Sequence, residues 1–127
     1  MTAQKMEGSA AVADRAEFVN EVRLAGRLAE VPEQRTLAGD VEVVQFRVVV
    51  ERPVGEAQGG VKPGRDSLEC TVWEPRLQKR VLKWAAGSSV EVTGALRRRF
   101  WRAEAGVASR TDVEVVTGRL TRRAGSG

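Results

Sequence analysis

Apolar and polar residues alternate along three stretches in the first half of the chain, Asn20–Leu28, Val41–Val50 and Ser67–Trp73. A period of two is typical of β-strands with one buried face, because successive side chains point to opposite sides. Gly26 interrupts the inward side of the first strand, as a glycine does where a strand bends or another backbone comes close. The side chains expected to face the core are Val22, Leu24, Leu28, Val44, Phe46, Val48, Val50, Leu68, Cys70 and Val72.

The same alternation predicts a β-hairpin between Ser88 and Val116, with its turn at Ala103–Gly106. One face should point toward the core, and it carries Val90, Val92, Gly94, Leu96 and Arg98. The opposite face should meet water, and it carries Glu91, Thr93, Ala95, Arg97, Arg99 and Trp101. An exposed indole beside guanidinium groups suits a nucleic-acid base, because the ring can stack on the base while the cations neutralise phosphate.

Between the third strand and the hairpin, Pro75–Ala86 has the period of three to four residues that is typical of a helix. Pro75 suits the first helical position, and Gly87 supplies a C-terminal stop. The apolar stripe consists of Leu77, Val81, Trp84 and Ala85, so Trp84 is interpreted as a core residue. Trp73 lies on the polar side of the preceding strand, where it is either exposed to contact a binding partner or packed beneath the helix.

The remaining segments are predicted to be ends and connections. Residues 1–19 are expected to form a flexible N-terminal segment, and residues 20–118 the folded domain. The basic stretch that begins at Thr117 is expected to leave the domain as a short C-terminal tail at 119–127. Ala29–Asp40 reads as an irregular connection because it holds a proline, a glycine and several charges. Arg52–Arg65 has two prolines and four glycines, and is either a mobile connector or a nucleic-acid contact.

The predicted order is three strands, one helix and two strands. Five short antiparallel strands with a helix between the third and fourth form the OB-fold, an all-β Greek-key barrel whose outer face and hairpin loops bind oligonucleotides. Closure of the sheet also removes the exposed edges that an open five-stranded sheet would have to protect.

Composition excludes several classes of protein. The 127 residues, 42% of them hydrophobic, make one ordinary domain, and no apolar run approaches the length of a membrane span. Cys70 is the only cysteine in the sequence, so no internal disulfide forms, and a cytoplasmic location is expected. Cys70 itself is interpreted as a small core residue. Histidine is absent and no catalytic or metal-ligand motif occurs, so neither an enzyme nor a cofactor or metal site is expected.

Charge is concentrated at the end of the chain. The net charge is +4, and residues 97–123 contain eight arginines against three acids, whereas residues 20–96 hold eleven basic and eleven acidic side chains. A clustered basic surface favours a polyanionic partner.

Three segments resemble bacterial single-stranded DNA-binding proteins. NEVRLAGRLAEVPEQR (Asn20–Arg35) is similar to the opening strand and turn of that family, and LECTVW (Leu68–Trp73) to its third-strand C-x-x-[FW] segment, especially in the actinobacterial branch. GSSVEVTGALRRRFW (Gly87–Trp101) is similar to its G-S-x-V-x-V-x-G-x-L-x-x-R-x-W stretch, and TDVEVV (Thr111–Val116) to its closing strand.

The resemblance implies a homotetramer of OB-folds that binds single-stranded DNA without sequence preference, in replication, recombination or repair. Trp101 and Trp73 match the family's stacking aromatics, whereas Ser67 and Val54 stand where further aromatics are usual. Each stacked base contributes about 1–3 kcal/mol, so the loss of two rings would weaken binding. The outward arginines expected to offset this through phosphate contacts are Arg23, Arg27, Arg47, Arg97, Arg99 and Arg110.

The C-terminal residues depart from the pattern of the replicative members. Those members carry a long linker and an acidic tail that recruits other proteins, whereas this sequence ends in TRRAGSG. Tail-mediated recruitment is therefore not expected. The alternative to DNA binding is an OB-fold interaction or regulatory module with weak or no nucleic-acid affinity.

Overall fold

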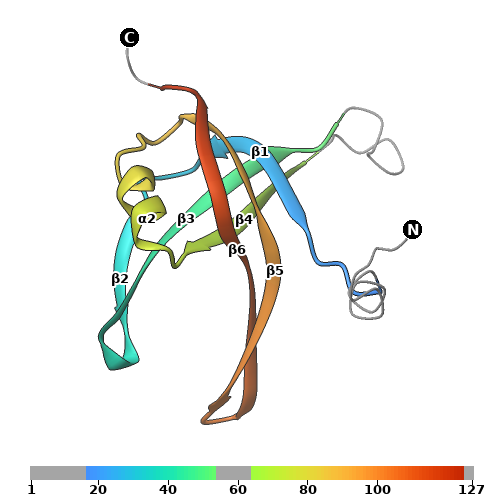
Figure 1. Ribbon diagram of the computed structural model, residues 1–127. Coiled ribbons are helices and arrows are strands. Elements are labelled where there is room, and N and C mark those ends of the chain that lie inside the picture. The colour runs from blue at the N-terminus through green and yellow to red at the C-terminus, as the bar shows by residue number, and fades with distance from the viewer. Residues whose placement is uncertain (1–16, 54–63, 125–127) are drawn as a thin grey trace, which may run out of the picture.

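The computed structural model describes residues 17–53 and 64–124. Most of the segment 1–19, the centre of the loop Arg52–Arg65, including Val54, and residues 125–127 of the expected tail lie outside the described residues. The elements in the described part are β1 (Val22–Leu28), β2 (Glu33–Leu37), the short 3-10 helix η1 (Ala38–Asp40), β3 (Val41–Glu51), β4 (Arg65–Val72), α2 (Pro75–Val81), β5 (Ser89–Ala103) and β6 (Gly106–Arg122) (Figure 1).

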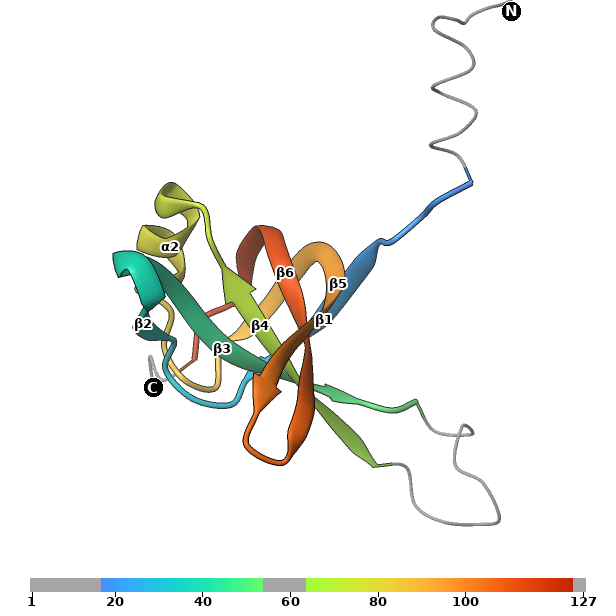
Figure 2. The ribbon, with the colours of Figure 1, turned by 90° about the horizontal axis from the view of Figure 1, so that it is seen from below.

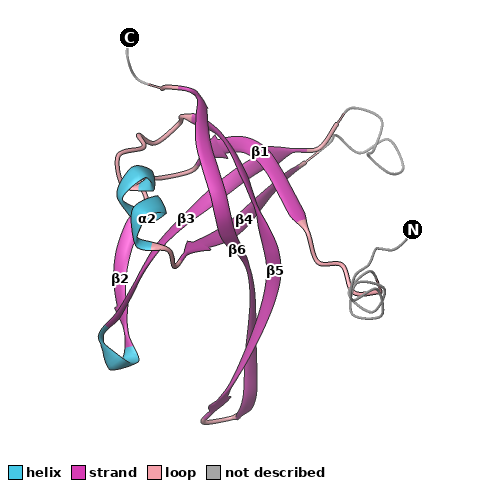
Figure 3. Ribbon diagram, in the orientation of Figure 1, coloured by secondary structure: helices cyan, strands magenta, loops and turns pink. Residues whose placement is uncertain are grey.

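Five of these strands close into a ring. β1 pairs with β5, β5 with β6, β6 with β4, β4 with β3, and β3 returns to β1, while β2 extends the sheet on β3 (Figure 3). Every pairing is antiparallel except that of β4 with β6, which is parallel and joins Cys70 to Val113, Thr71 to Glu114 and Val72 to Val115. This closed five-stranded barrel, with a helix between its third and fourth strands, is the predicted OB-fold.

The interior of the barrel is lined by most of the side chains that alternation assigned to the core; Leu68 is an exception, because it is only partly buried and lies outside the core cluster. α2 contributes two residues, and the Trp84 ring packs edge-on against Phe46 with 5.7 Å between ring centroids. The buried cluster consists of Leu28, Val44, Phe46, Val48, Cys70, Val72, Leu77, Val81, Trp84, Val90, Val92, Val113 and Val115, with Val22, Leu24, Val50 and Leu120 packed against it. Val43 is also fully buried, although alternation places it on the outer side of β3.

Cys70 is a core residue, as predicted. Its side chain is fully buried, and burial, together with the nearby carboxylates of Asp112 and Glu69, raises the pKa of the thiol to about 12. At neutral pH the thiol therefore stays protonated and unreactive.

Two segments interpreted as irregular are strands. Glu33–Leu37 forms β2, which pairs with β3 although all five of its residues are exposed. β6 continues to Arg122, where it pairs with Ser89, so most of the supposed tail after Thr117 belongs to the sheet. The first strand begins at Val22 instead of Asn20, but the Asn20 side chain substitutes for a strand pair: its Nδ2 donates to the Leu96 carbonyl and its Oδ1 accepts from the Leu96 N–H.

The helix is shorter than the predicted Pro75–Ala86 and ends at Val81. Its start is fixed by Pro75 and by Glu74, whose carboxylate accepts hydrogen bonds from the N–H groups of Leu77 and Arg76. These bonds hold the pKa of Glu74 below its usual value. Gly87, which has φ of 84°, lies in the turn that leads into β5 and does not end the helix. Ala85, which was assigned to the apolar stripe, is exposed.

No helix in residues 17–53 and 64–124 has the length and apolar character that crossing a membrane requires.

Two glycines let backbones approach closely, as expected for Gly26. A Cβ at Gly26 would overlap the carbonyl oxygen of Val49 on β3, and one at Gly94 would overlap that of Glu114 on β6. These glycines allow β1 and β5 to bend tightly around the barrel.

Two projections extend from the same end of the barrel. Figure 1 shows the β5–β6 hairpin and the turn between β2 and β3 both reaching toward the lower side, and the view from below shows β3 and β4 running between them (Figure 2). The surface between these projections holds the residues considered next.

Candidate nucleic-acid interface

The β5–β6 hairpin carries the indole ring of Trp101 near its tip. The ladder runs without a break from Gly94–Val115 to Ala103–Gly106, so a two-residue turn at 104–105 closes the hairpin as predicted. Gly106, with φ of 130°, supplies the backbone conformation that this turn needs. Trp101 is 49% exposed, on the side of β5 that also bears Arg97 and Arg99. Its ring is therefore accessible to a stacking partner.

Both of these arginines contact carboxylates of β6. The Arg97 Nε lies 2.8 Å from Oε1 of Glu114, and the Arg99 Nε lies 3.6 Å from Oδ1 of Asp112. Asp112 is 7% exposed, and its other oxygen accepts a 2.5 Å hydrogen bond from the hydroxyl of Thr71 on β4. The two ion pairs thus join the strands of the hairpin to each other, and the Thr71–Asp112 hydrogen bond joins the hairpin to β4.

Trp73 is half-buried at the end of β4, directly before the capping residue of α2. The guanidinium carbon of Arg99 lies 5.3 Å from the centroid of the indole, in a cation–π contact. The indole Nε1 is buried and has no hydrogen-bond partner among the described residues. Trp73 therefore has one ring face covered by Arg99, in contrast with the exposed Trp101.

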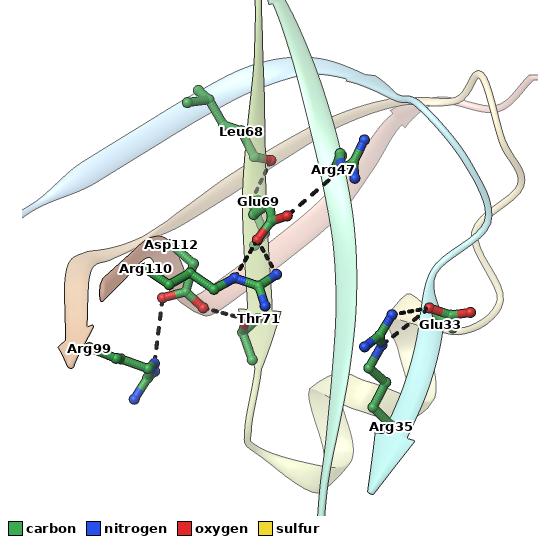
Figure 4. Close-up of polar contacts among 10 residues, drawn as sticks. Glu33, Arg35, Arg47, Leu68, Glu69, Thr71, Arg99, Arg110 and Asp112 are labelled. Atoms are coloured by element: carbon green, nitrogen blue, oxygen red, sulfur yellow. Dashed lines mark hydrogen bonds and ion pairs between the residues drawn. The ribbon is translucent and has the colours of Figure 1, made fainter. Parts of the chain in front are cut away.

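Arg110 and Arg47 share one carboxylate. Arg110 of β6 donates from Nε at 2.8 Å and from Nη2 to Oε1 of Glu69, and Arg47 of β3 approaches Oε2 of the same side chain at 4.0 Å (Figure 4). Figure 4 also shows the Arg99–Asp112–Thr71 chain beside this triad. The outer faces of β3, β4 and β6 are thereby joined by alternating charges.

A groove of about 300 Å³ lies beside these residues. Its walls come from β3, β4 and β6 and from the segment around β2, which adds Arg35. Arg35 is paired with Glu33 of its own strand, 3.2 Å from Nη2 to Oε1. The residues lining the groove are Glu30, Val31, Pro32, Glu33, Arg35, Gln45, Phe46, Arg47, Glu69, Cys70, Thr71 and Arg110.

Arg23 and Arg27 do not join this cluster. Arg23 and Arg119 both donate hydrogen bonds to the carboxylate of Glu91. These bonds hold the pKa of Glu91 below its usual value, and the bond from Arg119 has the larger effect. Arg27 lies 3.1 Å from Glu51, through Nη2 and Oε2. The structure thus groups Arg47, Arg97, Arg99, Arg110, Trp73 and Trp101, and places the two β1 arginines at separate carboxylates.

Phe100 is an exposed ring that the sequence interpretation missed. Alternation assigned Leu96 and Arg98 to the core side, but the hairpin has left the barrel at this point, and Leu96 is 50% and Phe100 62% exposed. The guanidinium carbon of Arg98 lies 5.1 Å from the Phe100 centroid. The signal was present in the sequence, since a strand much longer than the barrel wall has to expose both of its faces near the tip.

Among the described residues, no three histidine, cysteine, aspartate or glutamate side chains gather where they could hold a metal ion.

The closed barrel and its charged, aromatic outer face define an OB-fold of the class whose surface and hairpin loops contact oligonucleotides. The model of the single-strand binding protein family matches residues 19–122. The chain belongs to this family. Because its members are DNA-binding proteins without enzymatic activity, the prediction that the chain is not an enzyme is confirmed.

Relatives and solved structures agree with this assignment. The chain is 31% identical over 88 residues to single-stranded DNA-binding protein B of Bacillus subtilis, covering 69% of this chain and 76% of that protein. It is 30% identical over 89 residues to the single-stranded DNA-binding protein of Oceanobacillus iheyensis, covering 70% of this chain but only about half, 54%, of that protein. A Plasmodium falciparum SSB in complex with ssDNA has the same fold, with a TM-score of 0.67, 22% identity and coverage of 81% and 93%.

Proposed function

We propose that this chain binds single-stranded DNA without sequence preference, and that the outer face of the β5–β6 hairpin and the adjoining groove form the contact surface. The observation that carries the proposal is the exposed indole of Trp101 beside Arg97 and Arg99 on a projecting strand. The relatives named above as single-stranded DNA-binding proteins support the same substrate.

In this proposal Trp101 provides the platform on which a base stacks, at about 1–3 kcal/mol per base. When DNA binds, a phosphate replaces the carboxylate that each arginine of this surface contacts. Exposed ion pairs contribute only about 0–1 kcal/mol, so Arg97 and Arg110 can give up Glu114 and Glu69 at little cost when a phosphate replaces them. Stacking on Trp101 and the phosphate contacts of the arginines then contribute to the affinity together.

Trp73 acts together with Arg99. While the guanidinium covers the indole, a base can stack on the guanidinium group instead of on the ring. When Arg99 turns toward a phosphate, it uncovers the ring of Trp73 for a base. Trp73 is therefore a conditional platform that depends on the position of Arg99.

The wider assignments from the family resemblance also belong to this proposal. They are a homotetramer, a cytoplasmic location, a role in replication, recombination or repair, and placement in the actinobacterial branch. Light scattering of the purified protein, alone and with oligo-dT, tests the subunit count.

One observation favours the alternative of a protein-interaction module. Each of the six arginines assigned to phosphate is within 4.0 Å of a carboxylate, so the net positive charge of this surface is small. A module of this kind would keep the barrel and the hairpin but would not bind DNA strongly.

Tryptophan fluorescence separates the two functions. We expect oligo-dT to quench the emission, and the affinity to fall as salt is raised, because the phosphate contacts are screened. The Trp84→Phe variant is the control: Trp84 is 5% exposed in the core, so its removal should leave the quenching in place. Absence of quenching at low salt in both proteins would favour the interaction module.

A further inference from the structure

A second groove, of about 310 Å³, lies between the end of α2 and the C-terminal half of β6, and is called the α2–β6 groove below. Figure 1 shows α2 beside the upper part of β6, whereas the hairpin tip is at the opposite end of the same strand. The groove is lined by Arg80, Lys83, Trp84, Gly118, Arg119, Leu120 and Arg123. Four of these seven residues are cations and none is an acid.

The walls of this groove are held by direct contacts. Arg80 Nη2 donates a 2.9 Å hydrogen bond to the carbonyl of Gly118, which ties the helix to β6. A Cβ at Gly118 would lie 3.0 Å from the ring of Trp84, so a glycine here lets the strand pass close over the indole. The separation of the two walls is therefore set by the Arg80–Gly118 hydrogen bond and by the close packing of Gly118 on Trp84.

The charge of the α2–β6 groove is less balanced than that of the hairpin surface. Lys83 and Arg123 make no ion pair with any described residue, and Arg80 contacts a carbonyl instead of a carboxylate. Arg119 is paired with Glu91, which lies in a neighbouring depression and also binds Arg23. An anion entering the groove thus meets at least two cations that are not bound to a carboxylate of the described residues.

The floor of the groove indicates which part of a polyanion fits it. Trp84 is 5% exposed and its ring packs on Phe46, so it offers no free face to a base. Without an exposed aromatic ring, the attraction comes from positive charge alone, which a phosphodiester backbone matches whatever its bases are.

The outer face of β5 connects the two surfaces. Trp101, Arg99, Arg97, Ala95, Thr93 and Glu91 alternate onto one side of this strand, and the last of them contacts Arg119 at the groove. Ten residues of strand separate Trp101 from Glu91, which corresponds to about 33 Å. A short oligonucleotide held at Trp101 cannot reach the groove, whereas a longer one can.

We propose that the α2–β6 groove is a second DNA-contact site, which holds the sugar–phosphate backbone of a strand after it leaves the hairpin surface. This inference rests on the proposed function. It adds that contact in the groove is electrostatic, independent of the base, and engaged only by strands long enough to follow β5.

The test compares two double variants that lose the same charge. Lys83→Gln with Arg123→Gln removes the unpaired cations of the groove, and Arg76→Gln with Lys79→Gln removes two cations of α2 that do not line it. Binding is measured by fluorescence anisotropy of labelled oligo-dT over a range of salt concentrations. One oligonucleotide has about 4 nucleotides, the lower end of the range that one OB-fold binds and too short to span about 33 Å, and the other is several times longer. Thermal unfolding confirms that both variants fold.

For the long oligonucleotide, we expect the groove variant to reduce the slope of log K against log salt by about 1.4, since each lost contact to a single strand removes about 0.7. The control variant should keep the slope of the wild type, and the short oligonucleotide should bind all three proteins alike. Equal slopes for the two variants with the long oligonucleotide would overturn the inference, as would an equal loss with the short one.

Two further outcomes separate this inference from its premises. A wild-type protein that binds neither oligonucleotide would overturn the proposed function and the inference together. The groove variant could instead bind both oligonucleotides as the wild type does but lose binding of a labelled poly-glutamate peptide. That result would overturn the assignment to DNA and would indicate that the groove binds an acidic protein.

Discussion

The hydroxyl of Thr71 donates a 2.5 Å hydrogen bond to the buried carboxylate of Asp112, across the parallel junction where β4 meets β6. The other oxygen of Asp112 accepts no hydrogen bond from any described residue, and it lies 3.6 Å from the Nε of Arg99. This carboxylate therefore depends on Thr71 for its one hydrogen bond, and on Arg99 for charge compensation. It links the closure of the barrel to the arginine that covers Trp73.

We expect Thr71→Val to lower the free energy of unfolding by about 1–3 kcal/mol, because it leaves a buried carboxylate without its hydroxyl donor. Thr93→Val is the matched control: the Thr93 hydroxyl contacts that of Thr117 on the exposed side of the sheet, where water can replace it. Urea unfolding of the two variants gives the comparison. Equal losses in the two variants would mean that the Thr71–Asp112 hydrogen bond contributes no more to the free energy of unfolding than the exposed one does.

Trp101→Ala should weaken oligo-dT binding by about 1–3 kcal/mol without unfolding the protein, because the ring is half exposed and lies outside the core. Phe100→Ala removes a more exposed ring from the preceding residue, on the opposite face of the hairpin. We expect it to leave the affinity for a short oligonucleotide nearly unchanged. A comparable loss in both variants would show that the strand contacts both faces of the hairpin.

Gly26→Ala should destabilise the fold by about 1–3 kcal/mol or more, since its Cβ would overlap the Val49 carbonyl and force β1 away from β3. Gly64→Ala introduces the same methyl group where no atom of the described residues, apart from the chain neighbours, lies within 4 Å. Thermal melts of the pair should separate clearly, with the Gly64 variant close to the wild type. Similar melting temperatures for both would contradict the close approach of the two backbones.

The ion pairs of Glu91 should make part of the stability dependent on pH. Arg119 and Arg23 lower the pKa of Glu91 from its usual 4.5, so the folded state favours the ionised form. The resulting stabilisation is fully present above pH 4.5 and is lost as the pH falls through the lower pKa of the folded state. Urea titrations should therefore show a difference between wild type and Glu91→Gln that is constant near neutral pH and shrinks in acid.

Glu104→Gln provides the control for this experiment. Glu104 lies at the hairpin turn and makes no ion pair with any described residue. Its replacement removes no ion pair between described residues, so the free energy of unfolding should stay close to that of the wild type. A difference for Glu91→Gln that grows in acid would contradict the assignment.

The barrel strands were predictable because each has one buried face. β3 has the strongest alternation, and Val44, Phe46 and Val48 are buried as the pattern requires. β2 was missed for the opposite reason: all five of its residues are exposed, so it contains no apolar period and its pairing with β3 is the only sign of a strand. The ends of α2 and β6 were misplaced because propensity alone does not set where packing stops.

The candidate site was predictable in its location but not in its electrostatics. Alternation put Trp101, Arg97 and Arg99 on one side of a hairpin, and the structure has them there. Glu114 and Asp112, which neutralise Arg97 and Arg99, lie on the other strand of the hairpin, whereas Glu69 on β4, which pairs with Arg110 on β6, is 41 residues away in the sequence. Pairing of this kind follows from the register of the barrel, which a single sequence does not display.

The parallel junction of β4 with β6 bears on how the chain reaches its native state. It joins Cys70 to Val113 across 43 residues of sequence, while β1 must find β5 across 72, from Val22 to Gly94. Hairpins such as β5–β6 form locally within about 1–10 μs, whereas pairings between distant segments must first overcome the entropy of closing long loops. We therefore expect the hairpin that carries Trp101 to form early and the ring to close last, in the rate-limiting step of folding.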